Sequence, residues 1–153
     1  MKTLILGLGN PYLSDDSAGL KVIKELEGRV SNPDVALDEV SLAGISLLDY
    51  LVGYDRAIIV DAITTEDGKP GSIYRLTPEE FDNTCHTTSS HDIGVIAAIE
   101  LGRRLGLEMP AQIDIIGIEA ADVRTLTEEC TPNVKAAIPL AVDMILKEVN
   151  TVS

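Results

Sequence analysis

The feature that most constrains the fold is a set of short apolar runs at residues 4–6, 56–62 and 113–118. After Arg56, the run at 56–62 is apolar at consecutive positions until it reaches Asp61. A half-exposed strand alternates polar and apolar residues, whereas a strand covered on both faces does not. We therefore predict that this run is a central strand of a parallel sheet and that the other two runs are further strands.

The segments around these runs complete the pattern. Apolar residues spaced by three or four positions indicate amphipathic helices, and residues typical of turns separate the helices from the strands. The predicted helices cover residues 15–30, a short stretch from Gly44, a turn at 77–80, a stretch from Ser90 and a last helix after Thr131-Pro132; the predicted additional strands cover 35–42 and 72–76.

Individual side chains carry more specific expectations. Ser14 offers a capping oxygen to the first helix, and Thr77 with Glu80 fits a capping box. Pro139 should kink or interrupt the last helix, because proline lacks the amide hydrogen that the helix needs. The inward face of the helix from Ser90 is predicted to carry His91, Gly94, Val95, Ala98, Gly102 and Leu105.

Strands and helices alternate along the whole chain, which predicts an α/β fold. We expect a three-layer domain in which a twisted, mainly parallel sheet of about five strands is flanked by helices on both faces. The chain has 153 residues and 45% hydrophobic residues, enough for one domain with a full core, so residues 1–153 are predicted to form a single domain.

Charge narrows the classes of partner. The chain has 25 acidic and 12 basic residues and a net charge of -13. No cluster of Lys or Arg is arranged to neutralise a row of phosphates, so we expect neither nucleic acid nor a membrane surface as a partner. The apolar run at the amino terminus is too short for a signal peptide or a membrane span, which predicts a cytoplasmic protein.

The two cysteines, Cys85 and Cys130, lack CxxC spacing. We expect reduced thiols and neither a disulfide framework nor a thiolate zinc site. Nucleophilic catalysis is not supported, because the chain has no GxSxG motif and because Cys85 and His86, as neighbours in one loop, rarely form a productive pair.

Residues 7–20 read GLGNPYLSDDSAGL and follow the first strand. Glycines there permit a sharp turn and close approach of a ligand, and the carboxyl end of a strand is where α/β folds bind ligands. One interpretation is a dinucleotide site with Asp38 or Glu39 at the ribose. Against it, Tyr12 replaces the third glycine of the motif, and aspartates stand where a pyrophosphate would approach. We therefore expect no nucleotide.

A metal site is the second interpretation of the same edge. Asp16, Asp61 and His91 come from three segments that the fold can bring together, and two carboxylates with one imidazole suit a divalent ion such as zinc or nickel. His91 is preferred to His86 because a helix fixes its direction. Each residue also fits a structural role: Asp15 and Asp16 complement a helix dipole, Asp61 hydrogen-bonds a loop, and His91 packs at a helix start. On spacing alone, both interpretations stay open.

These same residues resemble a known family, the hydrogenase maturation proteases. The resemblance rests on four motifs in the family's order, within roughly the first two thirds of the chain. They are GLGNPYLSDDSAGL, then Gly44 with Leu47-Leu48 and Tyr54-Asp55, then Ile59-Val60-Asp61-Ala62, and then Ser90-His91-Asp92-Ile93-Gly94.

The resemblance implies an endopeptidase that removes a C-terminal peptide from the large subunit of a nickel-iron hydrogenase. It implies that Asp16, Asp61 and His91 act as metal ligands and catalytic residues, and that the metal is nickel already loaded into the substrate. Two departures concern the site: Asp16 stands where glutamate is frequent, which leaves Asp15 as a competing ligand, and Ser41-Leu42-Ala43-Gly44 replaces the usual Gly-Thr-x-Gly turn.

Two alternatives are kept beside the peptidase. One is a non-proteolytic metal-binding or chaperone-like module for the hydrogenase subunit, and the other is a small-molecule hydrolase on the same fold. Asp38 is a secondary site candidate, with a structural role at the exit of the second strand as its alternative. We expect the precursor of the large subunit as partner and a monomer as the oligomeric state.

Overall fold

The computed structural model describes residues 1–41, 47–84 and 95–150 and shows a five-stranded sheet in the order β2-β1-β3-β5-β4. The strands are β1 (Thr3–Leu8), β2 (Val35–Val40), β3 (Arg56–Ile63), β4 (Ile73–Leu76) and β5 (Gln112–Glu119). β1 pairs in parallel with β2 and β3, and β3 pairs in parallel with β5. Only the edge pair β4–β5 is antiparallel in this sheet, so the predicted mainly parallel sheet is confirmed.

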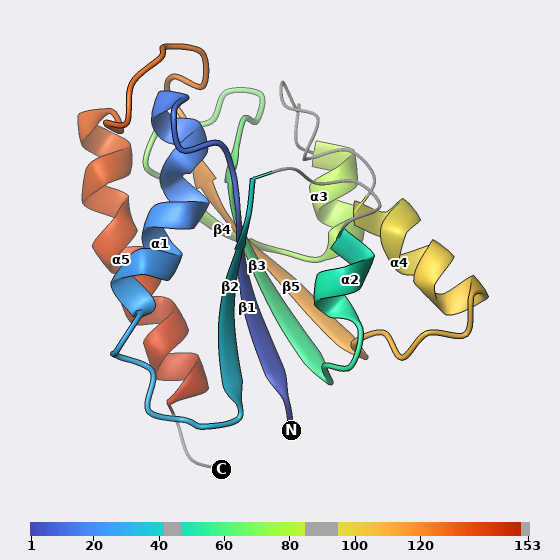
Figure 1. Cartoon of the computed structure of the whole chain (residues 1–153). Helices are drawn as coiled ribbons and strands as arrows, with labels where there is room; N and C mark the ends of the chain where they lie inside the picture. The colour runs from blue at the N-terminus through green and yellow to red at the C-terminus, as the bar shows by residue number, and fades with distance from the viewer. Residues whose placement is uncertain (42–46, 85–94, 151–153) are drawn as a thin grey trace.

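Helices cover both faces of the sheet (Figure 1). One face carries α1 (Ala18–Leu26) and α5 (Pro132–Val149), and the other carries α2 (Leu47–Leu51), α3 (Pro78–Thr84) and α4 (Val95–Arg104). A short 3-10 helix, η1 (Ser14–Ser17), connects the turn after β1 to α1. The predicted three-layer α/β fold is therefore confirmed.

The alternation of side chains in β3 shows why its sequence is apolar at successive positions. Ile58 and Val60 pack in the cluster beneath α1 and α5, whereas Ile59 and Ile63 pack in the cluster beneath α2, α3 and α4. All of these side chains are buried. A strand covered on both faces needs no polar side, as the sequence predicted.

The first helix is shorter than predicted. It opens as η1, becomes α-helical only at Ala18 and ends at Leu26, and Gly28 then adopts a φ of 77° that the helix cannot continue through. Ser14 does not cap it: neither η1 nor α1 has a side-chain cap, and the Ser14 hydroxyl donates to the carbonyl of Glu129. Val30 therefore lies beyond the helix.

The other helices follow the sequence with two differences. The Thr77–Glu80 capping box is confirmed, since each residue's side chain accepts the other's amide at 3.0 and 3.1 Å. α5 runs through Pro139, which lies on the exposed side of the helix, so the predicted interruption is not seen. Leu105 lies past the end of α4 and is 62% exposed, which corrects its predicted place on the inner face.

Some predictions fall outside the described residues. These are the helix start at Gly44, the start of the α4 segment at Ser90, and the inward placement of His91 and Gly94. Within the described part of that helix, Ala98 and Gly102 are buried as predicted. No helix among the described residues is long and apolar enough to cross a bilayer.

Candidate active site

The site lies where the order of the strands reverses. From β1 the chain passes through α1 to β2 on one side, and the next strand in sequence, β3, pairs on the other side of β1. The carboxyl ends of β1 and β3 therefore flank the point at which ligands bind in open α/β sheets. η1 packs against β3 at this edge.

Gly19 allows the first turn of α1 to rest directly on these strand ends. A Cβ at this position would lie 2.3 Å from the carbonyl oxygen of Val60 and 2.5 Å from that of Leu8. Both atoms belong to the backbone, so neither can move aside alone. The missing side chain therefore lets η1, which directly precedes α1, lie over β1 and β3.

Asp16 lies in η1 and is 2% exposed. Its Oδ2 atom accepts a hydrogen bond from the amide of Asn10 at 3.1 Å. The turn passes close to it because Gly9, with a φ of 153°, lacks a side chain: a Cβ there would lie 2.1 Å from the Asp16 carbonyl oxygen. The glycine turn thus holds Asp16 at the sheet edge.

Asp61 lies in β3, opposite Gly117 of β5, and is 1% exposed. The strand continues to Ile63, so Asp61 does not end it as the sequence suggested. By the two-residue period of a strand, Asp61 points to the same face as Ile59 and Ile63, which is the face covered by α2, α3 and α4. Asp16 and Asp61 are therefore two buried acids on adjoining elements at one edge.

His91 lies outside the described residues, and it precedes Val95 of α4 by four positions. α4 covers the face to which Asp61 points. Within residues 1–41, 47–84 and 95–150, no group of three or more His, Cys, Asp or Glu side chains is placed to hold a metal ion. The trio of Asp16, Asp61 and His91 therefore stays a prediction.

Asp38 does not share the position of these acids. It lies in the edge strand β2 opposite Leu6, two residues before the strand ends, and its side chain is exposed. Its Oδ1 atom accepts the amide of Glu39 at 2.8 Å. It therefore lies inside the strand and not at its exit, where the sequence had suggested a structural role.

Asp15 has a role that the sequence did not reveal. Its carboxylate is fully buried and accepts four hydrogen bonds: from the amides of Ala121, Asp122 and Thr131 and from the Thr131 hydroxyl, at 2.7 to 2.9 Å. All four donors belong to the segment between β5 and α5. Asp15 thus ties η1 to that segment, and the same bonds occupy the Thr131 hydroxyl, which does not cap α5.

The segment 120–131 has its own internal support. The Asp122 carboxylate accepts hydrogen bonds from the amides of Arg124 and Thr125 and from the Thr125 hydroxyl. The bond from the Thr125 hydroxyl and then the two amides hold the pKa of Asp122 below its usual range. The segment is therefore a shaped turn that lies against the site.

Glu119 is a further buried acid that the sequence analysis missed. It ends β5, is 2% exposed, and accepts hydrogen bonds from the amide and hydroxyl of Thr65. Both contacts join β5 to the turn after β3. A glutamate directly after an isoleucine-rich strand was the only signal for it, and its bonds indicate a structural role.

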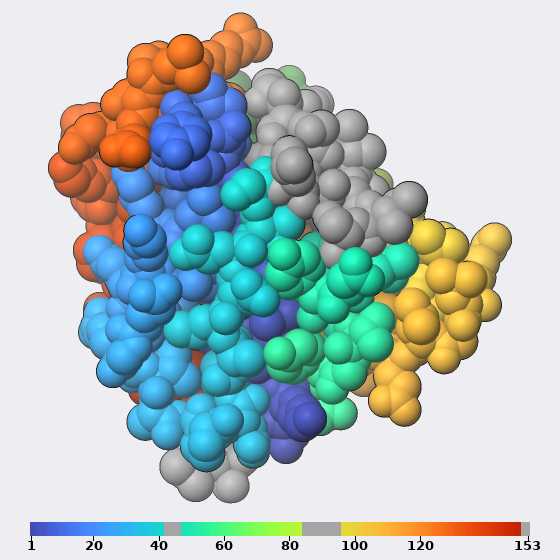
Figure 2. Space-filling view, viewed as in Figure 1, coloured from blue at the N-terminus to red at the C-terminus, as the bar shows by residue number. Residues whose placement is uncertain are grey.

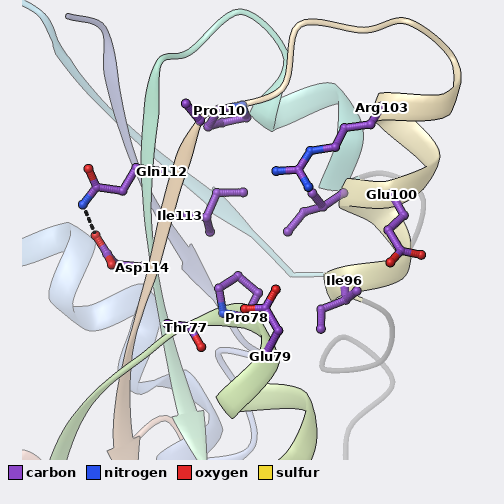
Figure 3. A pocket seen from close by; sticks show the side chains of 12 residues that line it. Thr77, Pro78, Glu79, Ile96, Glu100, Arg103, Pro110, Gln112, Ile113 and Asp114 are labelled. Carbon is purple, nitrogen blue, oxygen red and sulfur yellow. Dashed lines mark hydrogen bonds between the residues drawn. The ribbon is translucent and has the colours of Figure 1, made fainter.

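A cavity of about 330 Å³ lies at the other end of the sheet, between α3, α4 and the start of β5 (Figure 3). Pro78 and Glu79 of α3 and Arg103 of α4 border it, and Gln112 donates to Asp114 at 3.0 Å beside it. Since the start of a parallel strand is opposite its carboxyl end, this cavity is separate from Asp16 and Asp61.

Comparison with known proteins agrees with this fold. The family model described as hydrogenase maturation protease matches residues 20–148. The range contains Asp61 and His91 and begins after Asp16. The Hydrogenase 2 maturation protease of Escherichia coli K12 is 30% identical over 148 residues, which are 95% of this chain and 89% of that protein.

Solved structures give the same result. The hydrogenase maturating endopeptidase HybD from E. coli superposes with a TM-score of 0.84 at 30% identity, covering 97% of this chain and 91% of that one. The [NiFe] hydrogenase maturation protease HybD from Thermococcus kodakarensis superposes with a TM-score of 0.76 at 29% identity, covering 97% and 99%.

The fold and these relatives therefore define a peptidase of the α/β class. The chain belongs to the hydrogenase maturation protease family.

Proposed function

We propose that this enzyme removes a C-terminal peptide from the nickel-loaded precursor of a nickel-iron hydrogenase large subunit. The observation that carries the proposal is the pair of buried acids, Asp16 and Asp61, at the switch point of a member of this family. The two HybD relatives support the substrate class, because one is a hydrogenase maturating endopeptidase and the other a [NiFe] hydrogenase maturation protease.

Nickel is assigned to the substrate, and Asp16, Asp61 and His91 are assigned as its ligands on the enzyme. Two buried carboxylates held at one edge offer oxygen ligands of the kind that divalent cations bind. Carboxylates with an imidazole are a suitable donor set for nickel. Gripping an ion that belongs to the substrate fixes the scissile bond beside these residues, and positioning of this kind lowers the barrier.

Hydrolysis then consumes one water molecule. The water oxygen bonds to the carbonyl carbon of the scissile peptide, the C–N bond breaks, and the leaving nitrogen receives a proton. A carboxylate beside the water accepts the proton that the water loses, and Asp16 and Asp61 are the candidates for this role. The substrate's nickel stabilises negative charge on the carbonyl oxygen or activates the water.

We also infer that the reaction takes place in the cytoplasm.

The test is a processing assay with the nickel-loaded precursor, read by intact mass. The wild-type enzyme is expected to shorten the precursor from its C-terminus, and Asp16→Asn, Asp61→Asn and His91→Ala are each expected to lower the rate by about 100-fold or more. Asp38→Asn is the matched control, since Asp38 is an exposed aspartate of the edge strand β2 that does not share the position of Asp16 and Asp61. Its rate should equal that of wild type.

Two outcomes would contradict the proposal. An intact precursor after incubation with wild-type enzyme would indicate a binding module or an enzyme for another substrate. Full cleavage by all three site variants would show that the catalytic residues lie elsewhere.

A further inference from the structure

Two large, largely apolar side chains, Tyr12 and Leu126, are exposed on segments that adjoin the candidate site. Tyr12 is 60% exposed and precedes Asp16 by four positions, and Leu126 is 82% exposed in the segment 120–131 that Asp15 anchors. Isolated exposed apolar residues are ordinary on protein surfaces. This pair differs because the backbone joins the two residues to each other and to Asp16.

Backbone hydrogen bonds hold the two turns side by side. The amide of Thr127 donates to the carbonyl of Tyr12 at 2.9 Å, and the amide of Ser14 donates to the carbonyl of Thr127 at 2.9 Å. Leu13 and Thr127 form an isolated parallel bridge. In Figure 2 the orange segment after β5 lies against the blue segment after β1 at the upper edge of the molecule. Tyr12 and Leu126 therefore lie on two neighbouring turns.

A second set of bonds connects this pair to the candidate catalytic acid. The amide of Tyr12 donates to Oδ1 of Asn10 at 2.9 Å, and the amide of Asn10 donates to Oδ2 of Asp16 at 3.1 Å. Only one residue, Asn10, therefore stands between the backbone of Tyr12 and the Asp16 carboxylate. The turn that carries Tyr12 is thus the same turn that contacts Asp16.

The turn that carries Leu126 is fixed before any partner arrives. Asp15 holds its two ends through Ala121 and Thr131, and Asp122 holds its centre through Thr125. A surface that is already ordered loses little conformational freedom on binding, and apolar side chains on such a surface are effective contacts.

We propose that Tyr12 and Leu126, named here the Tyr12–Leu126 patch, dock an apolar segment of the hydrogenase precursor that flanks the scissile bond. The inference rests on the proposed function. The occupant follows from continuity with the site: a substrate chain whose cleaved bond lies at Asp16 advances about 3.3 Å per residue, so residues within a few positions of the cut reach the patch. Apolar residues fit it, because both exposed side chains are large and largely apolar.

The test compares steady-state cleavage of nickel-loaded precursor by wild type and by the Tyr12→Ser/Leu126→Ser double variant. We expect KM to rise about tenfold or more, which corresponds to about 1.4 kcal/mol, with kcat within about twofold of wild type. Tyr12→Leu combined with native Leu126 keeps an apolar side chain and should keep KM near wild type. Binding of precursor to immobilised enzyme should weaken by the same factor as KM rises.

Leu105→Ser is the matched control, because Leu105 is 62% exposed but follows α4, toward the opposite end of the sheet. It should leave both KM and kcat unchanged. Melting curves of all variants should coincide, since each changed side chain is exposed.

The outcomes separate the two proposals. If wild type cleaves the precursor and the double variant has an unchanged KM, the docking patch is wrong and the proposed function stands. If KM rises equally in Leu105→Ser, the effect is not local and the patch is also wrong. If wild type does not cleave the precursor, the proposed function is wrong, and the docking inference, which depends on it, is wrong as well.

Discussion

Asp15 and Asp16 are adjacent in sequence and serve different purposes. Successive residues of a 3-10 turn point in different directions, so one carboxylate faces the segment 120–131 and the other contacts the glycine turn at Asn10. Both oxygens of Asp15 already accept hydrogen bonds, which favours a structural role for this carboxylate.

This division predicts opposite phenotypes for the two aspartates. Asp15→Ala should lower the free energy of unfolding by about 3 kcal/mol or more, because it leaves buried amide donors without an acceptor. Asp16→Asn should lose cleavage and keep most of its stability. Urea denaturation of both variants, beside the exposed Asp38→Ala, measures the difference. An unfolding midpoint for Asp15→Ala equal to that of wild type would show that its hydrogen bonds do not stabilise the fold.

At the scale of elements, the segment 120–131 lies against the candidate active site, although it contains no candidate catalytic residue. It lies beside η1, and the carboxylate of Asp122 inside it accepts hydrogen bonds that favour the ionised form of that group. Acid should therefore affect this element through a group whose pKa is depressed in the folded state.

Asp122 supplies that group. Its hydrogen bonds from Thr125 and Arg124 place its pKa below the usual 3.8, so they stabilise the turn above pH 3.8 and are lost as the pH falls through the lowered value. The chemical shifts of the Arg124 and Thr125 amides are expected to move toward random-coil values only when the pH falls through the lowered pKa of Asp122. In Asp122→Asn the same amides should show no such transition. A transition that persists in this variant would assign it to another group.

At the scale of the whole molecule, much of the architecture was predictable because it depends on local pattern. The consecutive apolar residues of 56–62 indicated a central strand, and the spacing of Thr77 and Glu80 indicated a helix start; both follow from near neighbours in sequence. The end of α1 at Leu26 could not be predicted in this way, because the apolar spacing continues to Val30, whereas the positive φ of Gly28 turns the chain out of the helix.

The roles within the site were harder to predict for a related reason. The bonds of Asp15 reach across 106 to 116 positions of the chain, and no local pattern in η1 distinguishes its carboxylate from that of Asp16. The end of a strand can be predicted from the sequence to within a few residues, so the turn after β1 was predicted where it lies, whereas Asp61 lies two residues before the end of β3 and not at it. The direction of each side chain there depends on the fold.

The central claim is that the enzyme recognises nickel carried by its substrate through Asp16 and Asp61. The most direct measurement is the intact mass of the precursor after incubation with wild-type enzyme, with the precursor prepared either nickel-loaded or nickel-free. The account predicts loss of a C-terminal peptide from the nickel-loaded precursor alone. Equal cleavage of both preparations would contradict it.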